Sequence, residues 1–245
     1  MEVYNVKEVI FRDGTIDTRI YLHDVFIPHK IERKKKREEI PEDEQEDNLR
    51  RSASRAKQKI YEISRNEIWE WFVTLTLSPQ KVDRFNYGEC CKKVSQWLNN
   101  LRKKCPDLKY IVVPEEHEKG GYHFHGLFSG ISEDMISYSG HDHYKTGDKI
   151  YNLASYKFGW STMTKVKNNE ACVKYLTKYI TKDLIQSTKG RKKYWVSRNV
   201  ERPCTAFSFQ TDEDRCFLWQ ELSEDAVYMK EYQNKYNDIM YFQNR

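Results

Sequence analysis

Residues 121–128, Gly-Tyr-His-Phe-His-Gly-Leu-Phe, constrain the fold most strongly, because they are typical of a β-strand and also carry two histidines. Successive strand residues point to opposite faces, so His123 and His125 point to one face and Phe124 to the other. Two imidazoles on one face can bind one metal ion. The alternative is a pair of half-buried strand histidines that hydrogen-bond to the backbone.

A second histidine pair shows that spacing alone is weak support for a metal site. His141 and His143 have the same spacing, but they lie within residues 130–148, whose polar composition predicts a loop. Nothing in such a loop would hold both rings on one side. We therefore expect this second pair to be solvated surface.

Two glutamates and a histidine end the strand before the histidine pair. An odd number of loop residues between the two strands would place Glu115 and His117 on the face of His123 and His125, whereas an even number would bring Glu116 there instead. Two imidazoles and a carboxylate leave open positions for water and a phosphate oxygen, as a catalytic divalent ion requires. We predict His123, His125 and Glu115 as ligands, with Glu116 or His117 as alternatives to Glu115. Zinc fits these ligand types, whereas phosphate chemistry favours Mg2+ or Mn2+.

Tyr175 and Tyr179 lie four residues apart within residues 168–186, which are predicted to form a helix capped by Asn168 or Asn169. At this spacing the two tyrosines share one face of the helix. A buried stripe is the simpler explanation, and it would include three apolar neighbours: Val173, Leu176 and Ile180.

Lysines along the same helix argue against such a stripe. They recur at four-residue steps as Lys174, Lys178 and Lys182. A tyrosine hydroxyl ionises near pH 10, so it needs a nearby cation to act as a nucleophile at neutral pH. Lys178, between the two tyrosines, is the best candidate. A tyrosine pair beside a metal pair suggests phosphoryl transfer.

The order of predicted elements favours an α+β fold with a central antiparallel sheet and helices packed on one face. Asp13-Gly14 is expected to form the turn of an N-terminal hairpin. The predicted elements are a hairpin over residues 7–21, a charged linker over 30–48, a basic helix over 49–66, strands over 69–77, 108–117, 121–129 and 156–166, and helices over 87–101 and 168–186.

Charge is unevenly distributed along the chain, whose formal net charge is +5. Residues 156–199 contain eleven Lys or Arg and two acids, a net of +9, whereas residues 210–245 have a net charge of −4. A basic block around the tyrosines suits a polyphosphate backbone. The chain contains neither a membrane-spanning stretch nor a signal peptide, so we expect it to stay in the cytoplasm.

Basic and aromatic residues alternate after the tyrosine helix. Surfaces that bind single-stranded nucleic acid combine phosphate contacts with base stacking, although a solvated basic turn would have a similar composition. Including the helix lysines, the predicted DNA-binding residues are Lys174, Lys182, Arg191, Lys192, Lys193, Tyr194, Trp195 and Arg198.

These motifs together resemble HUH endonucleases that initiate rolling-circle replication. His123-Phe-His125 after a Pro-Glu strand, the strand Phe72-Val-Thr-Leu-Thr76 and Tyr175-Leu-Thr-Lys-Tyr179 occur in the order of that family's three motifs. The tyrosine motif resembles the two-tyrosine initiators of single-stranded DNA phages and plasmids. The resemblance covers roughly residues 69–183, and it implies a ferredoxin-like or RRM-like topology.

The resemblance implies a nickase and strand transferase for single-stranded origin DNA in a bacterial host. Tyr175 or Tyr179 would attack the scissile phosphate, leaving a 5′-phosphotyrosine link and a 3′-hydroxyl that primes a host polymerase. The absence of a phosphate-binding glycine loop implies that a host helicase unwinds the DNA. Residues 67–190 would form the endonuclease domain, preceded by residues 1–66 and followed by a C-terminal extension over 191–245.

Two other functions share parts of this pattern. A conjugative relaxase or a tyrosine transposase would use the same metal and tyrosine chemistry, and a recircularisation or transposition assay would distinguish them from an initiator. A catalytically inactive DNA-binding regulator would bind DNA with a strength set by salt and unaffected by magnesium or manganese.

Overall fold

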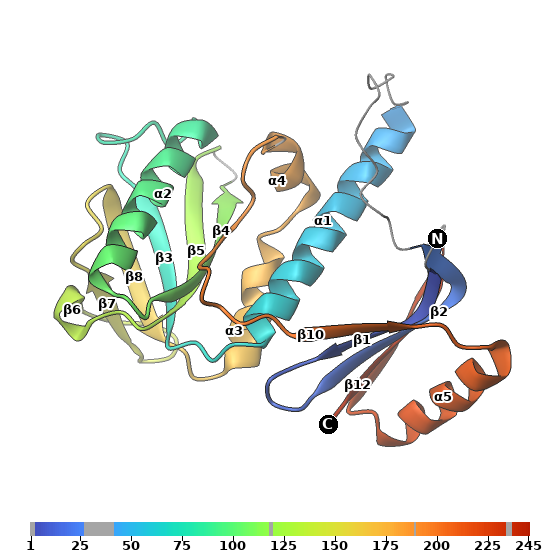
Figure 1. Cartoon of the computed structure of the whole chain (residues 1–245). Coiled ribbons are helices and arrows are strands. Elements are labelled where there is room, and N and C mark those ends of the chain that lie inside the picture. Colours follow the sequence, from blue (N-terminus) through green and yellow to red (C-terminus); the bar gives the residue numbers. More distant parts are fainter. Residues whose placement is uncertain (1–2, 27–41, 118–119, 189, 234–236) are drawn as a thin grey trace. The chain divides into compact units, whose positions relative to one another are not determined.

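A computed structural model describes the chain as two compact units, Ile40–Glu201 and a second unit made of Met1–Glu39 with Arg202–Arg245 (Figure 1). The first and last segments of the chain therefore fold together. The predicted linker falls outside the described residues as far as residue 41. The described residues are 3–26, 42–117, 120–188, 190–233 and 237–245.

A seven-stranded antiparallel sheet forms the centre of the larger unit, in the order β6-β7-β8-β3-β5-β4-β9. The predicted α+β class is confirmed. Its strands are β3 (Trp71–Leu77), β4 (Lys109–Glu116), β5 (Tyr122–Ser129), β6 (Ile136–Asp142), β7 (Lys149–Leu153), β8 (Gly159–Lys165) and β9 (Trp195–Val196). The helical elements are α1 (Glu42–Arg65), α2 (Tyr87–Lys104), η1 (Glu133–Met135), α3 (Asn169–Lys178) and α4 (Lys182–Ser187).

Helices cover both faces of this sheet, whereas the sequence predicted helices on one face. Trp97 of α2 contacts Phe128, and Tyr179 at the end of α3 contacts His125. Phe128 and His125 lie three residues apart on β5, so they point to opposite faces. Both faces need cover because consecutive residues of β4 are apolar, and Ile111, Val112 and Val113 are fully buried.

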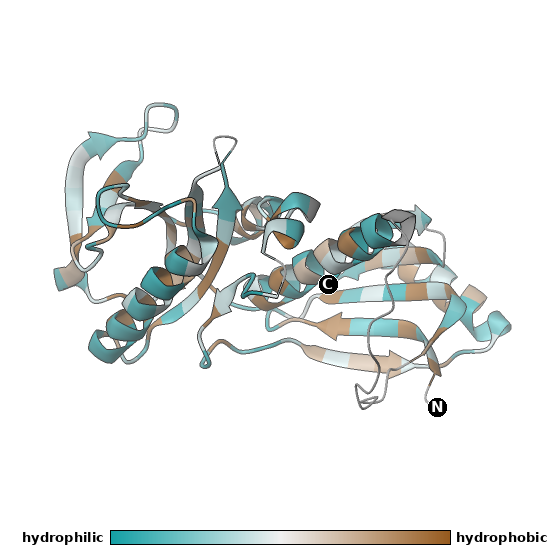
Figure 2. Cartoon of the chain, turned by 90° about the horizontal axis from the view of Figure 1, so that it is seen from above, coloured by the Kyte–Doolittle hydropathy of each residue, from teal (hydrophilic) through white to brown (hydrophobic). Residues whose placement is uncertain are grey.

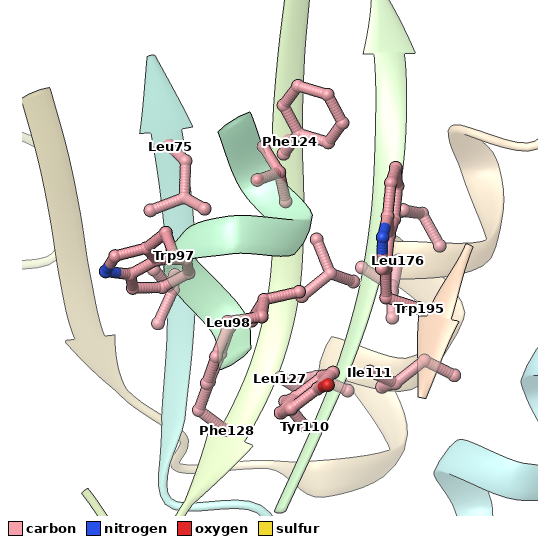
Figure 3. Close-up of a cluster of buried hydrophobic side chains, with 14 of the residues drawn as sticks. Leu75, Trp97, Leu98, Tyr110, Ile111, Phe124, Leu127, Phe128, Leu176 and Trp195 are labelled. Carbon is pink, nitrogen blue, oxygen red and sulfur yellow. The ribbon is translucent and has the colours of Figure 1, made fainter. Parts of the chain in front are cut away.

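The core between α2 and the sheet explains why β3 and β5 alternate in burial. Leu75 and Phe124 are cross-strand neighbours. Both pack in the same apolar cluster as Leu98 of α2 (Figure 3). The cluster continues on the other face, where Leu176 of α3 is also buried. This two-sided core fixes the register of the strands that carry the histidines.

Two predicted segments differ from the structure. Within residues 130–148, the polar strand β6 pairs with β7. Its pairing comes from tertiary partners, because exposed polar strands lack an alternating apolar pattern. The segment 168–186 forms two helices. Asn168 caps α3 as predicted, and the Thr181 hydroxyl starts α4 by accepting a hydrogen bond from the Leu184 amide.

Helix α1 begins at Glu42, earlier than the predicted residue 49. The acidic stretch before Leu49 suits a helix N-terminus, where the helix dipole favours negative charge. Glu46 also pairs with Arg50 one turn later, at 3.0 Å. No helix in the described ranges is both long and apolar enough to cross a membrane.

The smaller unit is a five-stranded antiparallel sheet in the order β10-β1-β2-β12-β11. The predicted hairpin is confirmed, with Gly14 in the left-handed region at its turn. Hydrophobic and hydrophilic residues alternate along the strands (Figure 2). Its elements are β1 (Val3–Ile10), β2 (Ile16–Phe26), β10 (Cys204–Ser208), α5 (Asp212–Asp225), β11 (Tyr228–Gln233) and β12 (Asp238–Asn244).

Candidate active site

The register of β4 and β5 decides which glutamate faces the histidine pair. His123 lies directly opposite Glu115, whereas Glu116 lies opposite Tyr122. Directly opposite residues of an antiparallel pair share a face. Glu115 therefore lies on the face of His123 and His125, and Glu116 points to the other face.

His125 is held at both ring nitrogens. Its Nε2 lies 2.7 Å from a carboxylate oxygen of Glu115, and its Nδ1 lies 3.1 Å from the Thr74 hydroxyl. The hydrogen bond from His125, with smaller effects of His123 and His117, lowers the pKa of Glu115 against the opposing effect of burial. Glu115 is thus an anion at neutral pH, and the buried His125 ring has a fixed orientation.

His123 lies beside a third histidine and an arginine. The rings of His117 and His123 are stacked, with centroids 5.7 Å apart. Burial is the main cause that lowers the pKa of His123, Glu115 opposes it, and the charge of Arg84 adds to the lowering. His123 is therefore neutral at neutral pH, which is the form that binds metals.

The donor types suit a divalent cation, although their present arrangement is a hydrogen-bonded one. In the described part of the chain, no three His, Cys, Asp or Glu side chains are already placed to hold a metal ion. Glu115 and His125 instead bond to each other. Two neutral-capable imidazoles and one carboxylate on a single sheet face remain a suitable donor set for Mg2+, Mn2+ or Zn2+.

The tyrosine pair lies over this same face. Helix α3 ends at Lys178, and Tyr179 follows as its cap residue. The Tyr179 ring lies 4.0 Å from the His125 ring and within 4° of parallel. The Tyr175 ring makes edge contacts with Phe72 at 5.5 Å and with Tyr179 at 5.4 Å.

The two tyrosines differ in exposure. Tyr175 is 47% exposed, whereas Tyr179 is partly buried between α3 and β5. Burial, followed by a hydrogen bond with Tyr175 and the nearby charge of Glu115, raises the pKa of Tyr179. The buried stripe of α3 contains Val173 and Leu176 without Tyr175. Tyr175 is thus the tyrosine that an external molecule can reach.

The lysines around the tyrosines have separate surroundings. Lys178 is exposed, and its ammonium lies 5.3 Å from the centre of the Tyr175 ring. Lys174 pairs with Glu170 at 2.6 Å on the surface of α3. Lys182 belongs to α4, so the helix break separates it from the row of α3 lysines. Its side chain lies outside the described part.

The basic segment after α4 packs along the β4 edge of the sheet. Lys193 donates to the Ser52 hydroxyl of α1 at 3.3 Å, and the Lys192 carbonyl accepts from the Tyr87 hydroxyl. Burial lowers the pKa of both lysine ammonium groups. The Arg191 guanidinium packs over Gly88. Tyr194 packs against the core, and Arg198 is exposed.

Trp195 has no face available for a nucleobase. Its ring is 2% exposed, stacks edge-on against Phe124 at 5.5 Å and donates to the Ser95 hydroxyl at 2.8 Å (Figure 3). The backbone of Trp195 also pairs with Val112 of β4. Its aromatic character therefore serves the core, which a basic and aromatic composition does not distinguish from a binding surface.

Two residues of the site were missed from the sequence. Thr74 lies opposite His125, and strand alternation alone would place it on one face of β3. Without the pairing of β3 with β5, however, that face could not be assigned to the histidines. Arg84 lies in the loop before α2, where no periodic pattern marks it. Its Nε is buried without a hydrogen-bond partner among the described residues.

A family model for replication-associated proteins of the ORF2 type matches residues 70–184. The matched segment, slightly less than half of the chain, contains Glu115, both strand histidines and both tyrosines. No curated protein and no solved structure matches the chain. The match supports a replication initiator family and a role in DNA replication.

Proposed function

We propose that this protein initiates rolling-circle replication by nicking and rejoining single-stranded origin DNA. The observation that carries the proposal is the stacking of Tyr179 on His125, which brings both tyrosines over the sheet face that holds Glu115. A nucleophile pair beside a carboxylate and imidazoles is the arrangement that metal-assisted phosphoryl transfer requires. The family match gives the same direction independently.

His123, His125 and Glu115 are the proposed ligands of Mg2+ or Mn2+. Binding would replace the hydrogen bond between Glu115 and His125, which frees His125 Nε2 as a donor. Thr74 holds the other ring nitrogen, as outer partners of metal-binding histidines do. A divalent ion there would supply positive charge that stabilises negative charge on the phosphate oxygens.

The proposed reaction transfers one phosphodiester bond without loss of bond energy. The tyrosine oxygen bonds to phosphorus while the bond from phosphorus to the 3′-oxygen breaks. The tyrosine gives up its proton, and the leaving 3′-oxygen takes one up. A later attack by that 3′-hydroxyl on the phosphotyrosine reverses the step and rejoins the DNA, so no nucleotide triphosphate is needed.

Tyr175 is proposed to attack first, with Tyr179 as the second nucleophile. Tyr175 is the more exposed of the two and has the Lys178 ammonium beside its ring. Tyr179 must leave His125 before its hydroxyl reaches a phosphate. After one round, Tyr179 would cleave the regenerated junction and release a circle. A host helicase and a host polymerase complete the cycle in this proposal.

The decisive test is a covalent adduct on labelled DNA. Single-stranded candidate origins labelled at the 3′ end are incubated with the full chain and Mn2+, Mg2+ or a chelator, and products are separated under denaturing conditions. We expect a labelled protein band with either metal and none with chelator. The double variant Tyr175→Phe with Tyr179→Phe is the matched control and should give no band.

Other outcomes would identify the other candidate functions. An adduct formed by the double tyrosine variant would refute the tyrosine assignment. Binding that depends on salt alone, with no adduct on any origin fragment, would indicate an inactive DNA-binding regulator. Adducts restricted to a transfer origin or a transposon end would identify a relaxase or a transposase.

A further inference from the structure

We propose that Trp160 is a stacking platform for a base next to the scissile phosphate. Trp160 lies on β8, and its indole is 62% exposed. An exposed tryptophan is unusual but has no meaning by itself. What gives it meaning is its place in the sheet. The inference rests on the function proposed above.

Strand pairing places Trp160 in the same row as the histidines. Thr76 of β3 is directly opposite Trp160 on one side and His123 on the other, and His123 is opposite Glu115. Cross-strand partners share a face, so Trp160 points to the side of the sheet that carries the candidate active site. Two strand spacings separate Trp160 from His123, which is about 10 Å.

The backbone beside Trp160 is closely fixed. A Cβ added to Gly159 would lie 2.0 Å from the carbonyl oxygen of Thr76. Only glycine allows β8 to approach β3 this closely. The indole therefore projects from a rigid strand, which lowers the entropy cost of stacking a base on it.

The sheet face around Trp160 remains open. Thr162, two residues along β8 and on the same face, is also exposed. Helix α3 instead packs over β5, where Tyr179 covers His125. A strand of DNA whose phosphate lies beside His123 and Tyr175 would thus have a flat aromatic ring within reach of an adjoining base. Stacking of this kind tolerates any base because every base has a π-face.

The test compares DNA affinity of variants that keep the strand intact. Trp160→Thr removes the ring but keeps a good strand former on a solvent-facing position. Trp160→Phe keeps a smaller ring. We expect Trp160→Thr to bind single-stranded DNA about tenfold more weakly in fluorescence anisotropy, and Trp160→Phe to recover most of the loss. Tyr144→Ala, an 85% exposed aromatic outside the sheet face, is the matched control and should bind as wild type.

An abasic scan separates stacking from a structural effect. Replacing one base at a time near the nick should reveal a position where the abasic DNA weakens wild-type binding but leaves Trp160→Thr binding unchanged. Such non-additivity identifies a direct contact. Equal losses at every position would refute stacking, as would wild-type affinity of Trp160→Thr.

The adduct assay keeps this inference distinct from the proposed function. If wild type forms the adduct while Trp160→Thr binds DNA normally, the stacking role is wrong and the nickase stands. If wild type never forms an adduct while Trp160→Thr binds weakly and shows the abasic signature, the base platform stands and the nickase is wrong.

Discussion

The Tyr179 ring lies flat on the imidazole of His125, with centroids 4.0 Å apart and planes within 4°. This contact fixes α3 over the histidine strand and leaves Tyr175 as the exposed member of the pair. Structure and proposed chemistry are thus linked through one ring stack. Its consequences can be measured separately for each tyrosine.

Single tyrosine variants should differ in which step they block. Tyr175→Phe is expected to abolish the first adduct, because the exposed nucleophile is lost while its ring contacts remain. Tyr179→Phe should still form the first adduct but fail to release circles. Gel analysis of adduct and circular product measures both. An adduct that survives Tyr175→Phe and disappears in Tyr179→Phe would reverse the order.

Thr74 is expected to act as a positioning residue for His125. Thr74→Val removes the hydroxyl that lies 3.1 Å from His125 Nδ1 and keeps the side-chain shape. Loss of such an outer partner typically costs roughly 10- to 100-fold in metal affinity or activity. Nicking rates titrated with Mn2+ should shift to higher metal concentration, with recovery in Thr74→Ser. An unchanged Mn2+ midpoint for Thr74→Val would exclude this role.

Lys178 is expected to assist ionisation of Tyr175. Lys178→Met should slow adduct formation at neutral pH by about tenfold or more and should recover as pH is raised, because a tyrosine without a nearby cation ionises near pH 10. Lys178→Arg keeps the charge and should be mildly affected. Lys103→Met, an exposed α2 lysine, is the control. Equal rates across pH for Lys178→Met and wild type would contradict the role.

Trp195 is expected to support stability and to take no part in DNA binding. Trp195→Ala should lower the free energy of unfolding by about 3–5 kcal/mol, because it empties a fully buried site. Urea unfolding measures the loss. The milder Trp195→Phe should stay folded and bind single-stranded DNA as wild type. Weaker DNA binding by a fully stable Trp195→Phe would return this residue to the interface.

Tyr4 should make the smaller unit sensitive to alkaline pH. Burial, with the neighbouring Tyr21, raises the pKa of Tyr4 from 10.0 to about 12. The folded state therefore holds the proton more tightly, so this stabilisation is present below about pH 10 and is lost as pH rises toward about 12. Near-ultraviolet circular dichroism should show unfolding in that window. Tyr4→Phe should weaken this pH dependence, and an identical profile would refute it.

Strand and helix existence was largely predictable from residue patterns. Alternation identified β3 and the histidine strand, and the spacing of apolar residues identified α2. Asn168 predicted the start of α3 through a local cap. The break after Tyr179 was not predicted, because a threonine cap within a helical pattern is a weak signal. The polar strand β6 was missed because tertiary pairing creates it.

The sequence by itself determined which residues are chemically able to form the site: the histidine pair, the glutamates before it and the tyrosine pair. Local periodicity also determined that the two histidines share a face. Only the tertiary structure decided that Glu115 joins them, that Tyr179 covers His125 and that Trp195 is buried. Strand register and helix placement depend on contacts between residues distant in sequence, and no local pattern encodes those contacts.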